Sequence, residues 1–192
     1  TEAPRRREQV RTTVHNRAST LEADVRKGGA TSPAVQECAG LPNHGMIPPL
    51  VPPRAGRDRR EVEVLERLIE HVLAGGVHGV FVLGTAGEGP SLGYRLRREM
   101  IAESCRIVAD RVPVLAGITD TAFVESVAVA EFATEAGVSS VVLSPPCYFP
   151  EGQPELWDYL HHIVPELPLP VLLYNMPMMT KISFAPETIC QT

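Results

Sequence analysis

The sequence predicts an α/β protein in which short buried strands alternate with amphipathic helices along one parallel sheet. Five apolar runs start about 26–34 residues apart, and a helical pattern follows each of them. This interval matches one βα unit, which averages about 31 residues in an eight-unit barrel. The runs lack polar–apolar alternation, which is typical of strands covered on both faces. We therefore predict an incomplete (β/α)8 TIM barrel of about five βα units.

Each predicted strand is a short run of apolar residues bounded by glycine, proline or polar residues. The first, "MIPPLV", is interrupted by two prolines, whereas "GVFVLG" and "LPVLLYN" contain longer stretches of branched and aromatic residues, which favour strands. The five strands span residues 46–51, 79–84, 112–117, 138–144 and 169–175.

Each predicted helix carries apolar residues at the spacing of a single helical face. Leu96 and Met100 are expected to face the core in the second helix, and Phe123, Val127 and Ala130 are expected to share a face in the third. Pro186 suits the first turn of a fifth helix. The first four helices span residues 61–74, 91–109, 121–136 and 154–164.

An open, doubly wound sheet is the alternative architecture, because it is also built from βα units. Its nucleotide-binding signature is GxGxxG after the first strand. In this sequence the glycine-rich loop follows the second strand and reads "GTAGEG", and the sequence contains no GK[ST] phosphate loop. These differences favour the barrel.

Composition narrows the class of protein. The 192 residues carry a net charge of −5 with a pI near 5.7, which gives no electrostatic reason to expect nucleic acid as a partner. We expect no membrane association, because no apolar run approaches the length that crosses a bilayer. The four cysteines form no CxxC pair, so we expect no metal site and a reducing, cytoplasmic location. No cofactor is expected.

The domain boundary is predicted near residue 44. Residues 1–44 lack aromatic residues and sustained apolar periodicity, so we interpret them as a disordered leader. Residues 45–192 form the predicted barrel domain.

Three motifs stand at the carboxyl ends of predicted strands: "GTAGE" (84–88), "SPPCYF" (144–149) and "YNMP" (174–177). In a parallel α/β barrel these ends converge on one mouth, where active sites are found. Exposed amides in a glycine-rich turn can bind an anion there.

With "MIPPLV", these motifs resemble the dihydrodipicolinate synthase and N-acetylneuraminate lyase family of pyruvate-dependent class I aldolases. The resemblance implies a lyase or synthase in which a lysine forms an imine with pyruvate or another small 2-keto acid. It implies that Tyr174 moves protons with the help of Thr85, and that Tyr148 reaches into the site of a neighbouring subunit. Gly84, Thr85, Ala86 and Gly87 would bind the carboxylate. The complete protein would be a homo-oligomer, a dimer or tetramer.

The sequence departs from the family pattern at three places. Ala86 replaces a polar residue that usually contacts the carboxylate. Met179 replaces the arginine of members that act as 4-hydroxy-tetrahydrodipicolinate synthase, and methionine cannot pair with a carboxylate. Neither lysine, Lys27 or Lys181, stands where the family carries its Schiff-base lysine, so we expect that lysine to be absent from this chain.

Three alternatives therefore stay open. The chain can be a catalytically dead, truncated relative that only associates with full-length subunits. It can be a 4-hydroxy-tetrahydrodipicolinate synthase proper, which Met179 disfavours. It can also be an open-sheet binding domain unrelated to aldolases.

Overall fold

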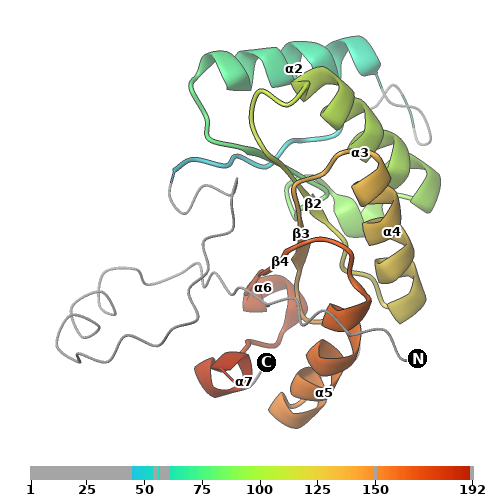
Figure 1. The fold of residues 1–192 in the computed structure, drawn as a ribbon, viewed down its shortest axis with the longest axis vertical. Coiled ribbons are helices and arrows are strands. Elements are labelled where there is room, and N and C mark those ends of the chain that lie inside the picture. The colour runs from blue at the N-terminus through green and yellow to red at the C-terminus, as the bar shows by residue number, and fades with distance from the viewer. Residues whose placement is uncertain (1–44, 54–55, 57–60, 149–150, 191–192) are drawn as a thin grey trace, which may run out of the picture.

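A computed structural model describes residues 45–53, 56, 61–148 and 151–190, and its centre is a parallel sheet (Figure 1). The strands follow one another in chain order, with each paired to the next, as in consecutive units of a βα barrel. The four strands are β1 (Val80–Val82), β2 (Val114–Gly117), β3 (Ser140–Leu143) and β4 (Val171–Leu173). The predicted leader, residues 1–44, lies outside the described residues.

Helices connect successive strands and cover one face of the sheet (Figure 1). Helix α2 packs against α3, and α3 packs against α4. The helices are α2 (Val62–Ala74), α3 (Tyr94–Val108), α4 (Phe123–Glu135), α5 (Gln153–Ile163), α6 (Pro177–Thr180) and α7 (Pro186–Cys190), with 3-10 turns η2 (Gly89–Ser91) and η3 (Val164–Glu166). None of the helices in these ranges is long and apolar enough to cross a membrane.

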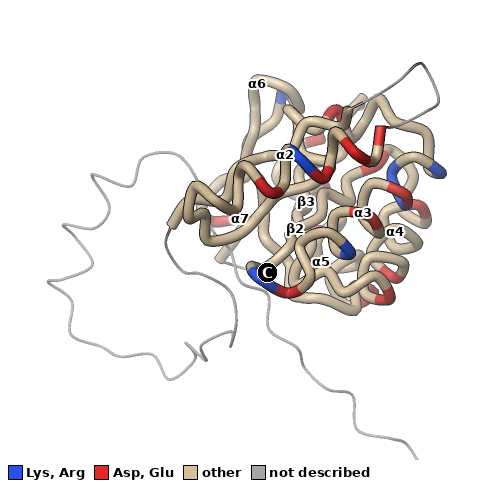
Figure 2. The backbone as a smooth tube through the Cα atoms, turned by 90° about the horizontal axis from the view of Figure 1, so that it is seen from above, with Lys and Arg blue, Asp and Glu red and all other residues tan. Residues whose placement is uncertain are grey.

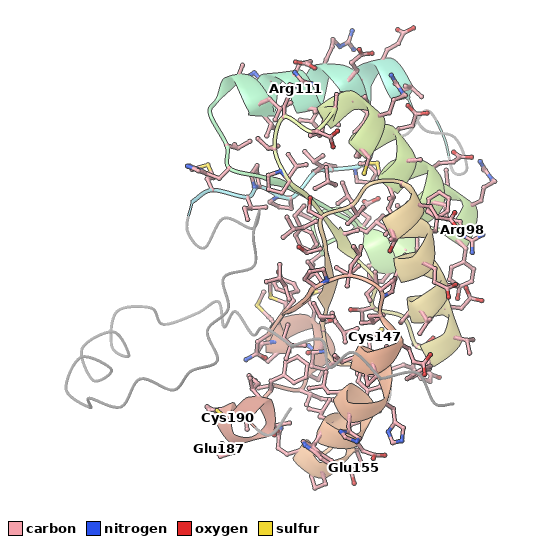
Figure 3. All side chains as sticks on the ribbon, viewed as in Figure 1. Arg98, Arg111, Cys147, Glu155, Glu187 and Cys190 are labelled. Carbon is pink, nitrogen blue, oxygen red and sulfur yellow. The ribbon has the colours of Figure 1, made fainter. Side chains whose placement is uncertain are left out.

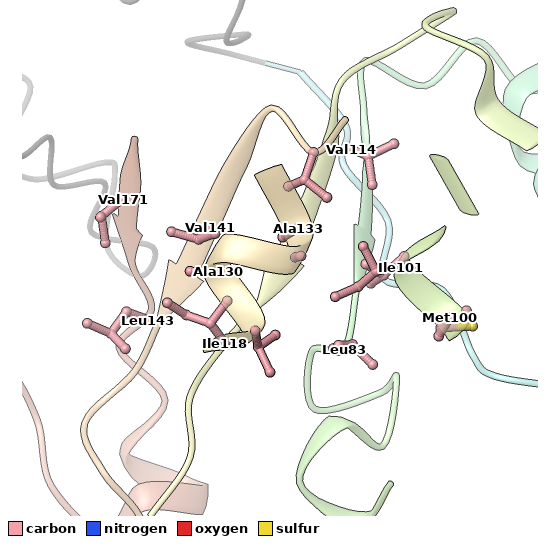
Figure 4. Packing of buried hydrophobic residues seen from close by; sticks show 14 of the residues in the cluster. Leu83, Met100, Ile101, Val114, Ile118, Ala130, Ala133, Val141, Leu143 and Val171 are labelled. Atoms are coloured by element: carbon pink, nitrogen blue, oxygen red, sulfur yellow. The ribbon is translucent and has the colours of Figure 1, made fainter. Parts of the chain in front are cut away.

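The main core lies between the sheet and these helices (Figure 4). The strand register aligns Val82, Ala116, Val141 and Val171 in one row across the sheet, and all four side chains are buried. Ile101 of α3 is fully buried in the same cluster. The strands carry no charged residue, whereas acidic and basic residues lie along the helices and loops around them (Figure 2).

The opposite face of the sheet is the one that points inward in a closed barrel. Alternation along the strands sends Phe81, Leu115, Val142 and Leu172 to this face. None of the four belongs to the main core cluster, and Phe81 and Leu172 are half-buried. Strands β1 and β4 do not pair with each other, so the described strands form an open sheet.

The predicted first strand, 46–51, is wrong as a regular strand. This segment runs beside β1 and joins it through one isolated bridge, between Pro49 and Phe81. The amide of Leu50 donates to the carbonyl of Phe81 at 2.8 Å, and the amide of Phe81 donates to Pro48 at 3.0 Å. Pro48 has no N–H to donate to β1, so the ladder does not extend from this bridge toward Met46. The described residues therefore form four regular strands and one bridged segment in place of five strands.

The helix prediction holds for α3, where Leu96, Met100, Ile101 and Val108 are buried. In α4, Ala130 is buried and Val127 packs against the core, whereas Phe123, at the start of the helix, is 37% exposed.

The open sheet leads to a prediction about self-association. Leu172 presents an apolar side chain on the inward face of the edge strand, so the 192-residue chain should associate through that face. Sedimentation velocity should show a marked fall in association for Leu172→Glu. The matched control is Val124→Glu on α4, where the side chain is 70% exposed on the helical layer. A chain that sediments as a monomer, or equal effects of the two changes, would contradict this view.

Candidate active site

The carboxyl ends of the four strands surround a small pocket, here called the strand-end pocket. Each strand contributes at least one lining residue just beyond its end: Thr85 after β1, Thr119 after β2, Ser144 after β3 and Tyr174 after β4. The cavity measures about 50 Å³, enough for about three or four water-sized groups. The pocket therefore suits a small polar molecule.

The 84–89 loop forms one wall of the pocket. Leu83, at φ 59°, turns the chain out of the sheet, and Glu88 adopts φ 50° before the chain enters η2. Within the loop, the amide of Glu88 donates to Thr85 at 3.1 Å and that of Gly89 donates to Gly84 at 3.3 Å. Thr85 and Ala86 are exposed, and no acceptor within the described part of the chain takes their amides. These two amides are thus available to an anion.

Close packing explains the glycines of this loop. A Cβ on Gly87 would lie 2.9 Å from the carbonyl oxygen of Leu50, and a Cβ on Gly89 would collide with the carbonyl of Leu83. A Cβ on Gly117 in β2 would lie 2.5 Å from that same carbonyl. The loop therefore packs directly on backbone, and side chains at these positions would push it outward.

Tyr174 lies opposite the loop. Its amide donates to Leu143 at 2.8 Å, which extends the β3–β4 ladder by one residue. Its ring meets the ring of Phe81 edge-on, with centroids 6.0 Å apart at 76°. Tyr174 and Thr85 line the same pocket, so the pair expected from the motifs is brought together.

Two hydroxyls in the pocket were not singled out by the sequence. The hydroxyl of Thr119 accepts the amide of Ser144 at 2.8 Å and its hydroxyl at 3.1 Å. This pair joins the ends of β2 and β3. The signal was available, because each is the first hydroxyl-bearing residue after a buried strand run.

A buried ion pair also reaches the pocket and was not foreseen. Arg97 of α3 lines the pocket and donates to the carboxylate of Asp120 at 2.6 Å. Their side chains are only 9% and 7% exposed. Burial opposes ionisation of Asp120, but the Ala122 amide and the Arg97 guanidinium outweigh it and hold the pKa of this carboxyl below its ordinary value.

Other predicted site residues lie elsewhere. Ala86 and Gly87 belong to the loop but do not line the pocket. Tyr148 is 84% exposed, adopts φ 90°, a strained conformation for a bulky residue, and does not line this pocket. Met179 is exposed on α6, and the Nζ of Lys181 donates to the carbonyl of Met178 at 2.8 Å. The described residues include no cluster of three or more His, Cys, Asp or Glu side chains suited to a metal ion.

The sequence profile of the Dihydrodipicolinate synthetase family matches residues 42–191. The chain belongs to this family. It is 36% identical over 146 residues to the 4-hydroxy-tetrahydrodipicolinate synthase of Thermus thermophilus, covering 76% of this chain and 48% of that protein. It is 32% identical to the enzyme of the same name from Methanococcus aeolicus, covering 76% of this chain and 50% of that protein.

Solved structures of the family agree with the fold. The dihydrodipicolinate synthase of Bacteroides thetaiotaomicron is 56% identical, with a TM-score of 0.73 over 77% of this chain and 49% of that one. YagE of E. coli K12, solved in complex with pyruvate, is 30% identical with a TM-score of 0.72, over 76% of this chain and 49% of that one. The chain spans about half the length of these relatives. The expected family and the incomplete (β/α)8 barrel are confirmed.

The packing of the loop predicts how it responds to an added methyl group. Gly89→Ala should lower the free energy of unfolding by about 1–3 kcal/mol, because the new Cβ meets the backbone of Leu83. Gly93→Ala is the control, since a Cβ there meets nothing within 4 Å. Urea unfolding measures both. A Gly89→Ala variant as stable as the control would show that the loop does not pack this closely.

Proposed function

We propose that the strand-end pocket binds pyruvate or a small 2-keto acid as part of a Schiff-base class I lyase or synthase. The observation that carries this proposal is the placement of Thr85 and Tyr174 on one small pocket, at the carboxyl ends of parallel strands. Family membership supports it, since the relatives are named as synthases. Two structural relatives, YagE and the enzyme of Acinetobacter baumannii, were solved with pyruvate.

In this proposal the keto acid lies with its carboxylate against the 84–89 loop. The exposed amide and the hydroxyl of Thr85, which lines the pocket, would donate to the carboxylate oxygens, and the exposed amide of Ala86 follows in the same turn. Ala86 contributes only its amide, so the anion loses one donor that a hydroxyl would supply. Such a hydrogen bond to a charged group contributes about 1.5–3 kcal/mol, which weakens binding without abolishing it.

Tyr174 would act as the proton carrier. Imine formation and carbon–carbon bond cleavage both require a proton to move at the reacting carbon or oxygen. The edge-on contact with Phe81 and the sheet hydrogen bond hold the ring of Tyr174 at the pocket wall. Tyr148 would complete the proton path in a neighbouring subunit of a homo-oligomer, and its exposed side chain is compatible with that role.

The imine-forming lysine is the part of the chemistry that these 192 residues do not supply in our proposal. Lys27 lies outside the described residues. Lys181 is exposed, and its ammonium group donates to the carbonyl of Met178 on its own short helix. It does not line the strand-end pocket. These residues would therefore bind and orient a keto acid without themselves forming the covalent intermediate.

The second substrate is proposed from the residues that follow Tyr174. Helix α6, which begins three residues after Tyr174, carries the exposed side chains of Met178 and Met179, and neither can pair with a second carboxylate. This favours a lyase for a sugar acid or other 2-keto acid. Synthesis of 4-hydroxy-tetrahydrodipicolinate is the second candidate, because the curated relatives cited above carry that name.

Loss of the Thr85 hydroxyl should weaken pyruvate binding. Thr85→Val should raise the Kd roughly 10- to 100-fold, as expected for one hydrogen bond to a carboxylate. Thr134→Val is the control, since this hydroxyl donates to Ala130 within α4. An NMR titration of the full chain measures both. Equal affinities for Thr85→Val and the unaltered chain would overturn the proposed carboxylate site.

Trapping with borohydride tests the assignment of the nucleophile. Incubation of the 192-residue chain with pyruvate and borohydride should give no stoichiometric adduct, because Lys181 lies away from the pocket. Mass spectrometry of the intact chain and its peptides detects such an adduct. A full adduct mapped to Lys181 would show that this chain carries its own imine-forming residue.

A further inference from the structure

We propose that the buried Arg97–Asp120 ion pair positions the 84–89 loop for anion binding, with Arg97 as a positioning residue. Arg97 lines the strand-end pocket, and its ion pair with Asp120 ties the residues just after this loop to the segment that follows β2. We call the ion pair and its hydrogen bonds to Pro90 and Leu92 the Arg97 clamp. Its functional meaning rests on the proposed role of the loop in binding a keto acid. The clamp itself is defined by contacts that can be tested separately.

Arg97 holds two backbone carbonyls on its own side of the pair. The Nε of Arg97 donates to the carbonyl of Leu92 at 2.9 Å, and one terminal nitrogen donates to the carbonyl of Pro90 at 3.4 Å. Both carbonyls stand directly after the loop. The loop's own turn hydrogen bonds, such as Glu88 to Thr85 at 3.1 Å, join only residues of the same local segment. Arg97 therefore adds an anchor that connects this segment to α3 and Asp120.

The carboxylate of Asp120 is held by donors other than Arg97. Its second carboxylate oxygen accepts the amide of Ala122 at 3.1 Å. The amide of Asp120 in turn donates to the hydroxyl of Ser126 in α4 at 3.1 Å. The hydroxyl of Tyr94 donates to the carboxylate oxygen of Asp120 that accepts the Ala122 amide, at 3.4 Å. The guanidinium of Arg97 lies 5.1 Å from the centre of the Tyr94 ring. The clamp thus connects the ends of β1 and β2 through groups that cannot easily turn away.

A buried ion pair loses hydration on both partners, and well-packed apolar residues of similar size often give equal or greater stability. Stability alone is therefore a weak reason for an ion pair at this place. Directional hydrogen bonds to Pro90 and Leu92 are what an apolar pair cannot provide, and a binding loop needs its donors fixed to within about 0.5 Å.

The other long-range ion pair of the described chain offers a matched control. Arg111 donates to both oxygens of Glu70, at 2.8 and 2.6 Å, across α2 and the turn before β2. Figure 3 shows Arg111 beside α2, away from Cys147, which follows β3. This pair is exposed and stands at the amino ends of the strands.

The experiment compares Arg97→Met/Asp120→Leu with Arg111→Met/Glu70→Leu in the full chain. Amide hydrogen exchange should be at least tenfold faster at Glu88, Gly89 and Leu92 in the first variant and unchanged in the second. The Kd for pyruvate should rise about tenfold in the first variant only, with a similar midpoint of thermal unfolding in both.

Loop exchange equal to that of the unaltered chain in Arg97→Met/Asp120→Leu would overturn the positioning role. If that variant does not fold, Arg97→Lys replaces it, because one ammonium group cannot serve Leu92 and Asp120 together; unchanged loop exchange there would equally overturn the role. If the unaltered chain binds no pyruvate, the proposed function fails, while the exchange rates still decide whether the ion pair positions the loop.

Discussion

Parallel pairing of consecutive strands is the constraint on which the rest of the structure depends. Because all four strands run in one direction, their carboxyl ends meet at one edge of the sheet. One small pocket is thereby lined by residues that lie up to about 90 positions apart in the sequence, namely Thr85, Thr119, Ser144 and Tyr174. The helices that return the chain also bury the outer face of the strands, so the scaffold that places these polar groups is rigid.

Close approach of backbone to backbone then shapes the pocket. Gly87, Gly89 and Gly117 allow the 84–89 loop to lie directly on Leu50 and Leu83, which leaves the amides of Thr85 and Ala86 at the surface. The Arg97–Asp120 pair connects this loop to the neighbouring strand end. The close packing of the 84–89 loop on backbone therefore holds the loop in place and leaves its amides exposed to an anion.

Much of the fold was predictable because its signals are local. Strand spacing and apolar periodicity located the four regular strands and α3. The missing N–H of Pro48 interrupts the first strand, which an apolar run alone does not reveal. In α4, small and apolar residues surround the helix, so periodicity did not identify Phe123 as exposed. Arg97 and Asp120 are 23 residues apart, on a helix and a loop whose approach is set only by the tertiary fold. Motifs identified Thr85 and Tyr174, but they did not identify the hydroxyls of Thr119 and Ser144.

Pyruvate binding in the strand-end pocket is tested most directly by a crystal structure of this chain, determined from crystals soaked with pyruvate. Pyruvate should occupy the strand-end pocket, with its carboxylate against the 84–89 loop and within about 3.2 Å of the amide nitrogen of Thr85. The ring hydroxyl of Tyr174 should face the keto group. Pyruvate bound elsewhere on the chain, with an empty strand-end pocket at saturating concentration, would contradict this assignment of the binding site.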